Sequence, residues 1–308
     1  MLIIVGLFEF LFLVIIVLLR VAFFTLLERK VLGYIQYRKG PNKVGVLGLL
    51  QPIRDAIKLL TKEFMHLVSY NLIFYYLCPV LSIFFFFYFW VLYPFGGGRV
   101  DLFYGFLLYI GIAGLMVYAL LGIGWSSNCK YSLLGALRGI VQIISYEISL
   151  LILMLCFIFL IGGYRMKHLG ISQDIIFLIL VLGPLLILWF GSRIAERNRS
   201  PFDFSERESE LVSGFNTEYG SGIFALIFIA EYGRVLYIGY LFFILFFGGY
   251  RVLSGIGGLI VRFLVIWVRG GFPRHRYDSL MRIAWKSFLP IRLLFILLIY
   301  YYSFIIYC

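Results

Sequence analysis

Residues 3–27 read IIVGLFEFLFLVIIVLLRVAFFTLL, and only Glu9 and Arg20 among them carry a charge. A helix that crosses a bilayer needs about 20 mostly apolar residues, so this stretch predicts a transmembrane helix. The rest of the chain has the same character, because 63% of its 308 residues are hydrophobic and only 14% are charged. Soluble domains contain about a quarter charged residues. We therefore expect lipid, not water, to surround most of this chain.

Seven further apolar stretches predict further spans: 71–93, 103–125, 139–162, 174–192, 221–247, 252–268 and 289–307. Each is expected to be helical, because a lone segment in lipid has to satisfy its own backbone hydrogen bonds. The stretch 252–268 is the weakest of them, since it is short, rich in glycine and contains Arg262. The sequence thus predicts an all-α fold, a polytopic transmembrane helix bundle of about eight spans, forming one membrane domain over residues 1–308.

The basic residues are distributed unevenly between the two sides of the predicted bundle. The loops 28–70, 126–138, 193–220 and 269–288 hold 19 of the 27 Lys and Arg residues, and the alternate loops hold four. This bias predicts that the basic loops face the matrix or cytoplasm. The net charge of +12 is also typical of proteins that bind nucleic acid. Because the basic residues follow the loops as topology signals do, we expect no nucleic-acid partner.

The first basic loop contains a predicted amphipathic helix after Pro52. Its apolar residues recur at helical spacing on one side: Ile53, Ala56, Ile57, Leu60 and Phe64. Its charged residues occupy the other side: Arg54, Asp55, Lys58 and Lys62. Such a helix lies in the plane of the membrane surface. It either anchors the chain to the headgroups or forms the wall of a ligand entrance with Asp55 facing inward. Glu28 and Arg29 either end the first span or stand at the mouth of an internal site.

Acidic residues within the predicted spans are candidates for proton exchange, because charges in a membrane are costly and usually functional. Glu147, which follows the hydroxyl-bearing Tyr146, and Glu231 are the two strongest. Arg234 follows Glu231 by three positions, so the two side chains can also simply pair. The four cysteines and three histidines are scattered without the spacing of a metal or iron–sulfur site, so no metal site is predicted.

The loop 193–220 concentrates acids and arginines. The acids are Glu196, Asp203, Glu206, Glu208, Glu210 and Glu218, and the arginines are Arg193, Arg197, Arg199 and Arg207. Ser205 and Glu208 also match a capping box, so one acid can serve only to cap a short helix. Crowded carboxylates raise one another's pKa values. The loop is therefore either a solvated, salt-bridged segment or one end of a chain of acids that continues through Glu147 and Glu231.

Four long motifs, in the same order, resemble the chain 1 family of the proton-pumping NADH:quinone oxidoreductase, respiratory complex I. They are ERKVLGYIQYRKGPNKVG with LLQPIRDAIKLLTKE (28–63), GWSSNCKYSLLGALRGIVQIISYEI (124–148), AERNRSPFDFSERESELVSGFNTEYGSGIFALIFIAEY (195–232) and PRHRYDSLMRIAWKSFLP (273–290). Two positions depart from the family pattern. Arg207 stands where a small residue is usual, and His275 stands where an aromatic residue is usual.

The resemblance implies roles for particular side chains. Residues matching the quinone chamber and its passage are Glu28, Arg29, Arg38, Asp55, Asp203, Glu206, Glu208, Arg274 and Arg276. Residues matching the start of the polar proton path are Tyr146, Glu147, Glu196 and Glu231.

The resemblance also implies the chain's partners and location. Ubiquinone is expected as a substrate, and NADH, FMN and iron–sulfur clusters are expected on partner subunits, because this chain has no motif for them. The expected partners are other membrane and hydrophilic subunits, quinone and lipids. A compact chain rich in Phe and Tyr favours the mitochondrial inner membrane over a bacterial plasma membrane. Two other classes of function stay open: a stand-alone ion or proton transporter, and a structural anchor for the hydrophilic arm.

Overall fold

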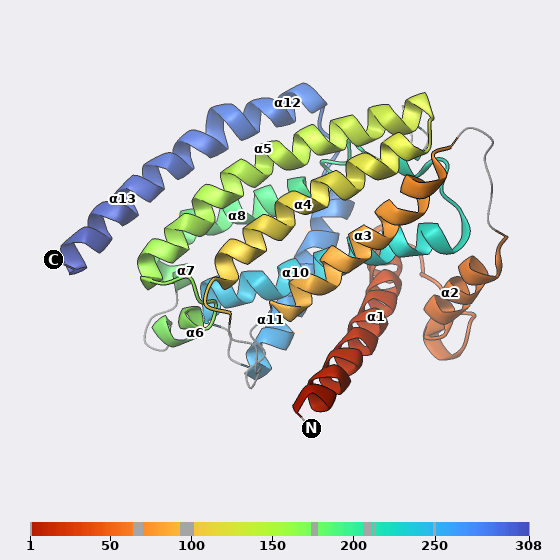
Figure 1. Ribbon diagram of the computed structural model, residues 1–308, viewed down its shortest axis with the longest axis horizontal. Coiled ribbons are helices and arrows are strands. Elements are labelled where there is room, and N and C mark those ends of the chain that lie inside the picture. Colours follow the sequence, from red (N-terminus) through yellow and green to blue (C-terminus); the bar gives the residue numbers. More distant parts are fainter. Residues whose placement is uncertain are drawn as a thin grey trace.

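The computed structural model describes residues 2–63, 70–92, 102–173, 178–205, 211, 213–248 and 251–307. Within these ranges the regular elements are all helical, as the sequence predicted (Figure 1). The α-helices are α1 Leu2–Ile35, α2 Gln51–Thr61, α3 Leu72–Val91, α4 Gly105–Ser126, α5 Lys130–Ile161, α6 His168–Ser172, α7 Leu178–Val181, α8 Gly183–Glu196, α10 Ser221–Phe247, α11 Arg251–Gly271, α12 Tyr277–Arg282 and α13 Leu289–Tyr307. Short 3₁₀ turns occupy Val46–Gly48 and Gly214–Asn216, and a π-helical stretch, Ile283–Phe288, joins α12 to α13.

Six described helical segments are long and apolar enough to cross a membrane: Phe8–Ile35, Leu72–Val91, Gly105–Ser126, Lys130–Ile161, Ser221–Phe247 and Tyr277–Tyr302. The chain is thus a multi-pass helical membrane protein. Helices α10 and α13 have the predicted bounds, whereas α1 and α5 are longer than predicted. Because α1 continues to Ile35, Glu28 and Arg29 lie inside this helix and do not end it.

The other two predicted spans differ from the six. The stretch 174–192 is not one helix where it is described, because the helix breaks at Leu182 between α7 and α8. Pro184 explains the break, since proline lacks an N–H group and restricts the residue before it. The stretch 252–268 does form one helix, α11, of 21 residues. Over its described residues, α11 is not among the six.

The long helices α3, α4 and α5 lie side by side, and α10 packs across α3, α1 and α11 (Figure 1). Helix α13 packs along α5 at one edge of the bundle, and α2 lies at the opposite side against α1 and α10. This arrangement brings the polar end of α8 and the chain after it into the middle of the bundle, between α4, α5 and α10.

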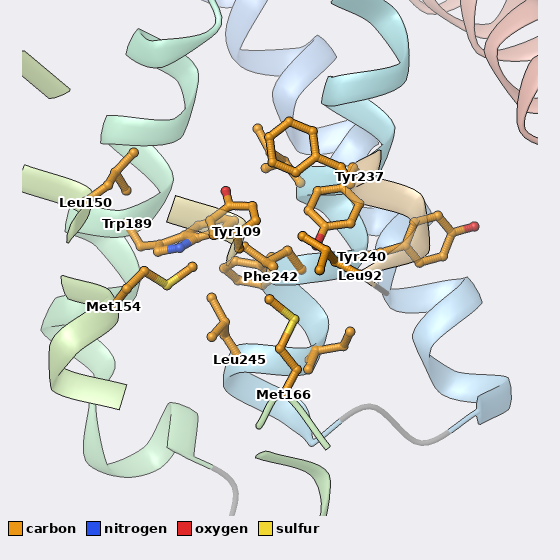
Figure 2. Close-up of a cluster of buried hydrophobic side chains, with 14 of the residues drawn as sticks. Leu92, Tyr109, Leu150, Met154, Met166, Trp189, Tyr237, Tyr240, Phe242 and Leu245 are labelled. Carbon is orange, nitrogen blue, oxygen red and sulfur yellow. The ribbon is translucent and has the colours of Figure 1, made fainter. Parts of the chain in front are cut away.

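A large aromatic core holds these helices together (Figure 2). Trp189 of α8 contacts Phe242 of α10, with 5.1 Å between ring centroids, and Tyr109 of α4 stacks on Tyr237 of α10 at 6.0 Å. Lipid is as apolar as these side chains, so helix association in a membrane depends on close van der Waals packing. The core therefore fixes where α8 ends, and with it the position of the charged residues that follow.

Candidate functional site

A buried carboxylate lies near the inner end of α1. The Glu28 side chain is 6% exposed and accepts a hydrogen bond from Arg199 Nη1 at 3.1 Å and another from Arg269 Nη1 of α11. The guanidinium of Arg199 also lies over the Tyr232 ring, 4.1 Å from its centroid. Burial alone would lower the pKa of Arg199, but Tyr232 and Glu28 more than compensate and raise it above its ordinary value. One carboxylate thus joins α1, α11 and the loop after α8.

A second ion pair joins α1 to the amphipathic helix. Arg29 Nη1 donates to Asp55 Oδ2 at 2.7 Å, and Gln51 Nε2 donates to Asp55 Oδ1 at 2.9 Å. Lys30 Nζ donates to the carbonyl oxygen of Leu47 at 2.6 Å. Asp55 therefore points toward α1.

The opposite side of α2 is apolar and uncovered. Ile53, Ile57 and Leu60 are 48%, 56% and 70% exposed. Their spacing along one side confirms the predicted amphipathic helix, which begins at Gln51 with Pro52 in its first turn. Phe64, predicted to continue this side, lies outside the described residues. A helix that is polar toward α1 and apolar on its far side is suited to the membrane surface.

Glu147 and Glu196 line one cavity between α4, α5 and α8, together with Tyr109 and Arg193. Arg193 Nη1 donates to Glu196 Oε2 at 2.8 Å, and Arg197 Nη2 lies 3.6 Å from Glu196 Oε1. Glu147 is half-buried. Two acids from different helices therefore line the same cavity, which Arg193 also lines.

Glu231 and Arg234 line a second cavity between α3, α4 and α10. Arg199 and Asp203 lie close enough to Glu231 to interact with it electrostatically. The acids Glu147, Glu196, Glu231 and Asp203 are thus arranged around the end of α8 and the loop after it.

Tyr146 has a different environment from its neighbour Glu147. Its hydroxyl donates to the carbonyl oxygen of Leu280 at 3.2 Å, and its ring meets Phe288 edge to face. Tyr146 is 1% exposed and packs between α5 and the α12–α13 segment. Its ring and hydroxyl contact the α12–α13 segment, and Tyr146 is not among the residues that line the cavity of Glu147 and Glu196.

The remaining predicted residues lie toward the surface. Arg274 and Arg276 are exposed in the turn before α12, and Arg38 is exposed with its Nε donating to Gln36 Oε1 at 2.9 Å. His275, one of the two departures, stacks on Phe202 with 5.3 Å between centroids. Glu206, Arg207, Glu208 and Glu210 lie outside the described residues. Among the residues that are described, no three His, Cys, Asp or Glu side chains gather as a metal site.

Gln142 is a residue of this site that the sequence did not identify. Its Nε2 donates to the carbonyl oxygens of Ala195 at 2.6 Å and Phe202 at 2.8 Å, and the side chain is fully buried. It therefore holds both ends of the charged stretch after α8 against α5. The signal was present, because an amide in an apolar span has to find hydrogen-bond partners.

Comparison with known proteins finds relatives of this chain over most of its length. The family model described as NADH dehydrogenase matches residues 8–300. The chain is similar to NADH-ubiquinone oxidoreductase chain 1 of Aedes aegypti, 52% identical over 285 residues that cover 92% of this chain and 91% of the relative. The Branchiostoma lanceolatum protein of the same name is 47% identical over 90% of this chain and 89% of its own length. The Trichosurus vulpecula protein of the same name is 44% identical over 91% of this chain and 91% of its own length. The chain therefore belongs to the NADH dehydrogenase family, whose members include NADH-ubiquinone oxidoreductase chain 1.

Proposed function

We propose that this chain is the quinone-site membrane subunit of a proton-pumping NADH:ubiquinone oxidoreductase of the mitochondrial inner membrane. It forms the passage by which ubiquinone reaches its reduction site and the first part of the path that moves protons. NADH, FMN and iron–sulfur clusters belong to partner subunits. Quinone and lipids are the small-molecule partners of this chain.

The proposal rests on two neighbouring sets of ion pairs at the C-terminal end of α1. Glu28 is held by Arg199 and Arg269, and Asp55 is held by Arg29 on the side of α2 that faces α1, opposite the apolar side of that helix. A charged, hydrogen-bonding region next to an apolar membrane-surface helix suits a ligand with a polar headgroup and a long apolar tail. Burial of the tail contributes about 0.8 kcal/mol per CH₂, less what lipid already provides, so the net affinity is modest and the product leaves easily.

Reduction of the headgroup takes up two electrons and two protons. The electrons arrive from a partner subunit, and the proton demand falls on acids near the headgroup, for which Asp203, Glu206 and Glu208 are the candidates. Glu196, Glu147 and Glu231 then carry the resulting change in charge into the bundle. In support of this, Glu147 and Glu196 line one cavity and Glu231 lines another. Acids held away from water are suited to exchange protons near neutral pH.

A photoreactive ubiquinone analogue with an isoprenoid tail tests the proposal in the assembled complex. We expect labelled peptides from this chain to contain residues 28–38, 51–63, 197–205 or 273–276, and excess unlabelled ubiquinone to suppress the labelling. Labelling confined to other subunits, or to α13, would show that this chain does not form the ubiquinone passage.

The alternative functions give different results. A stand-alone transporter would move ions when this chain alone is reconstituted in liposomes, whereas a complex subunit would be inert without its partners. A pure anchor would tolerate Asp203→Asn and Arg276→Lys with unchanged quinone kinetics. We expect no ion movement by the chain alone and a raised KM for quinone in both variants.

A further inference from the structure

Arg292 is a buried cation in the first turn of α13 that belongs to none of the predicted sites. Its side chain has an exposed fraction of 0%, and it lies in a helical segment long and apolar enough to cross a membrane. Its Nη2 donates to the carbonyl oxygen of Leu188 of α8 at 2.7 Å, and its guanidinium lies 5.4 Å from the centroid of the Phe288 ring. These contacts fix the charged end of Arg292 between α13 and α8.

No carboxylate is paired with Arg292 within the part of the chain that the structure describes. Its Nε and Nη1 are buried there without a hydrogen-bond partner. The described groups that interact with it electrostatically are Arg193, Tyr146 and Cys156, and none of these is a carboxylate. Because the side chain is fully buried, it does not reach the membrane surface as a snorkelling arginine does. A charge inside a spanning segment is costly, so an unpaired one indicates that the charge itself has a role.

Phe288 brings Arg292 close to both α5 and α8. The Phe288 ring meets the Tyr146 ring of α5 edge to face, with 6.2 Å between centroids, and the guanidinium of Arg292 lies over the same ring. A Cβ added at Gly191 of α8 would lie 3.3 Å from Cζ of Phe288, so the glycine lets α8 approach this ring closely. Phe288 also ends the π-helical stretch Ile283–Phe288, and such stretches are frequent at functional sites. Close packing at Phe288 thus holds Arg292 between Tyr146 and α8.

Arg193 links Arg292 to the acids of the proposed proton path. It interacts electrostatically with Arg292, and its Nη1 donates to Glu196 Oε2 at 2.8 Å. It also lines the cavity that Glu147 and Glu196 share. Two guanidinium groups repel each other, and the repulsion is stronger where water is excluded. The charge of Arg292 therefore favours the arrangement in which Arg193 is paired with Glu196, and a nearby cation favours the ionised form of a carboxylate.

We propose that Arg292 is a positioning residue of the proton path, whose fixed charge keeps Arg193 paired with Glu196 and keeps Glu196 ionised until a proton reaches it. The role depends on the charge of Arg292 and not on its hydrogen bond to Leu188. Arg292 acts through Arg193 and is not itself a carrier of the proton. The inference rests on the proposed function, because it assigns one more residue to the same path.

Three substitutions in the assembled complex separate the charge of Arg292 from its hydrogen bond. Arg292→Lys keeps the charge, Arg292→Gln keeps a donor for the Leu188 carbonyl oxygen without the charge, and Arg292→Met keeps a similar volume with neither. Arg282→Gln, at an exposed position of α12, is the matched control. The number of protons moved per electron and the NADH:ubiquinone activity are measured in proteoliposomes over a range of pH around neutrality.

We expect the pH profile of proton movement to shift to higher pH by roughly half a unit in Arg292→Gln and Arg292→Met, because an acid that loses a nearby cation keeps its proton to higher pH. The profiles of Arg292→Lys and Arg282→Gln should match that of the native complex. Unshifted profiles in both neutral variants overturn the proposal. A shift in Arg292→Met alone also overturns it, because it assigns the effect to the lost hydrogen bond. If neither neutral variant assembles while Arg292→Lys does, the charge serves assembly and the positioning role is wrong.

This inference and the proposed function fail in different ways. Unshifted profiles, in complexes whose ubiquinone analogue labels this chain and whose proton movement is normal, overturn the role of Arg292 alone. Labelling of the native complex confined to other subunits overturns the proposed function and, with it, the role of Arg292.

Discussion

Arg199 and Glu28 form a buried ion pair, with 3.1 Å between Nη1 and Oε1, although 171 positions separate them in the chain. The pair fixes the loop after α8 against α1, one residue from Arg29, which holds Asp55. The proposed quinone passage and the proposed proton path therefore meet at this contact. A change in charge in the quinone passage therefore alters the electrostatic energy of groups in the proton path, because the two share the same few ionised groups.

Glu28→Gln should impair ubiquinone reduction while the redox centres on the hydrophilic subunits stay assembled. The substitution leaves Arg199 and Arg269 buried without their shared anion, and breaking a buried pair in this way costs about 3–5 kcal/mol. We expect NADH:ubiquinone activity to fall at least tenfold, while NADH oxidation by a water-soluble acceptor at the hydrophilic subunits is retained. Glu63→Gln, at an exposed position after α2, is the matched control. Normal quinone reduction in Glu28→Gln would show that the pair is dispensable.

Gln142→Leu should loosen the charged loop. The carbonyl oxygens of Ala195 and Phe202 would lose their common donor. The oxygen of Ala195 keeps the N–H of Asn198 at 3.3 Å, whereas a buried oxygen left unsatisfied at Phe202 costs about 1–3 kcal/mol. We expect a lower temperature of thermal inactivation and faster proteolysis within residues 197–205. Gln36→Leu, at an exposed position after α1, should change neither property. Identical behaviour of the two variants would mean that Gln142 does not hold the loop.

The crossing of α4 and α5 makes a prediction about packing. A Cβ added at Gly124 would overlap the methyl group of Ala136, whereas nothing lies within 4 Å of a Cβ added at Gly111 on the same helix. Overpacking costs about 1–3 kcal/mol. Gly124→Ala should therefore lower the denaturation temperature of the complex in detergent, and Gly111→Ala should leave it unchanged or slightly raised, since alanine is the better helix former. The reverse order would contradict this helix pairing.

The orientation of α2 can be measured with a polarity-sensitive dye on single introduced cysteines. Ile57 is 56% exposed and lies on the apolar side of the helix, whereas the next residue, Lys58, lies on the polar side. We expect the dye on Ile57→Cys to report an apolar environment in a membrane and the dye on Lys58→Cys to report water. Equal, aqueous spectra at both positions would show that α2 does not lie on the bilayer.

Much of the fold could be predicted because a segment that crosses lipid has to be both apolar and helical. Helix α10 has the predicted bounds, Ser221–Phe247, since its ends coincide with the ends of its apolar run. Helix α5 begins at Lys130, nine residues before the predicted start, because hydropathy limits only the part of a helix that lies in lipid. The break at Leu182 follows from Pro184, a local signal that the apolar composition of 174–192 concealed.

The site was predictable as a set of residues and not as a set of contacts. The cost of charge in a membrane singled out Glu147 and Glu231, and both line cavities. The pairing of Glu28 with Arg199 and Arg269 could not be inferred, because it depends on how α1, α11 and the loop after α8 come together. Tyr146 shows the same limit, since its sequence neighbour Glu147 faces a cavity while its own hydroxyl binds Leu280.

The proposal that Glu147 belongs to the proton path can be tested by the proton-to-electron stoichiometry in proteoliposomes, with the complex carrying either Glu147→Gln or the control Glu63→Gln. We expect Glu147→Gln to lower the number of protons moved per electron while the KM for ubiquinone stays within about twofold of the native value, because Glu147 lines a cavity that none of Glu28, Arg29 and Asp55 lines. An unchanged stoichiometry in Glu147→Gln, at an undiminished rate of quinone reduction, would contradict it.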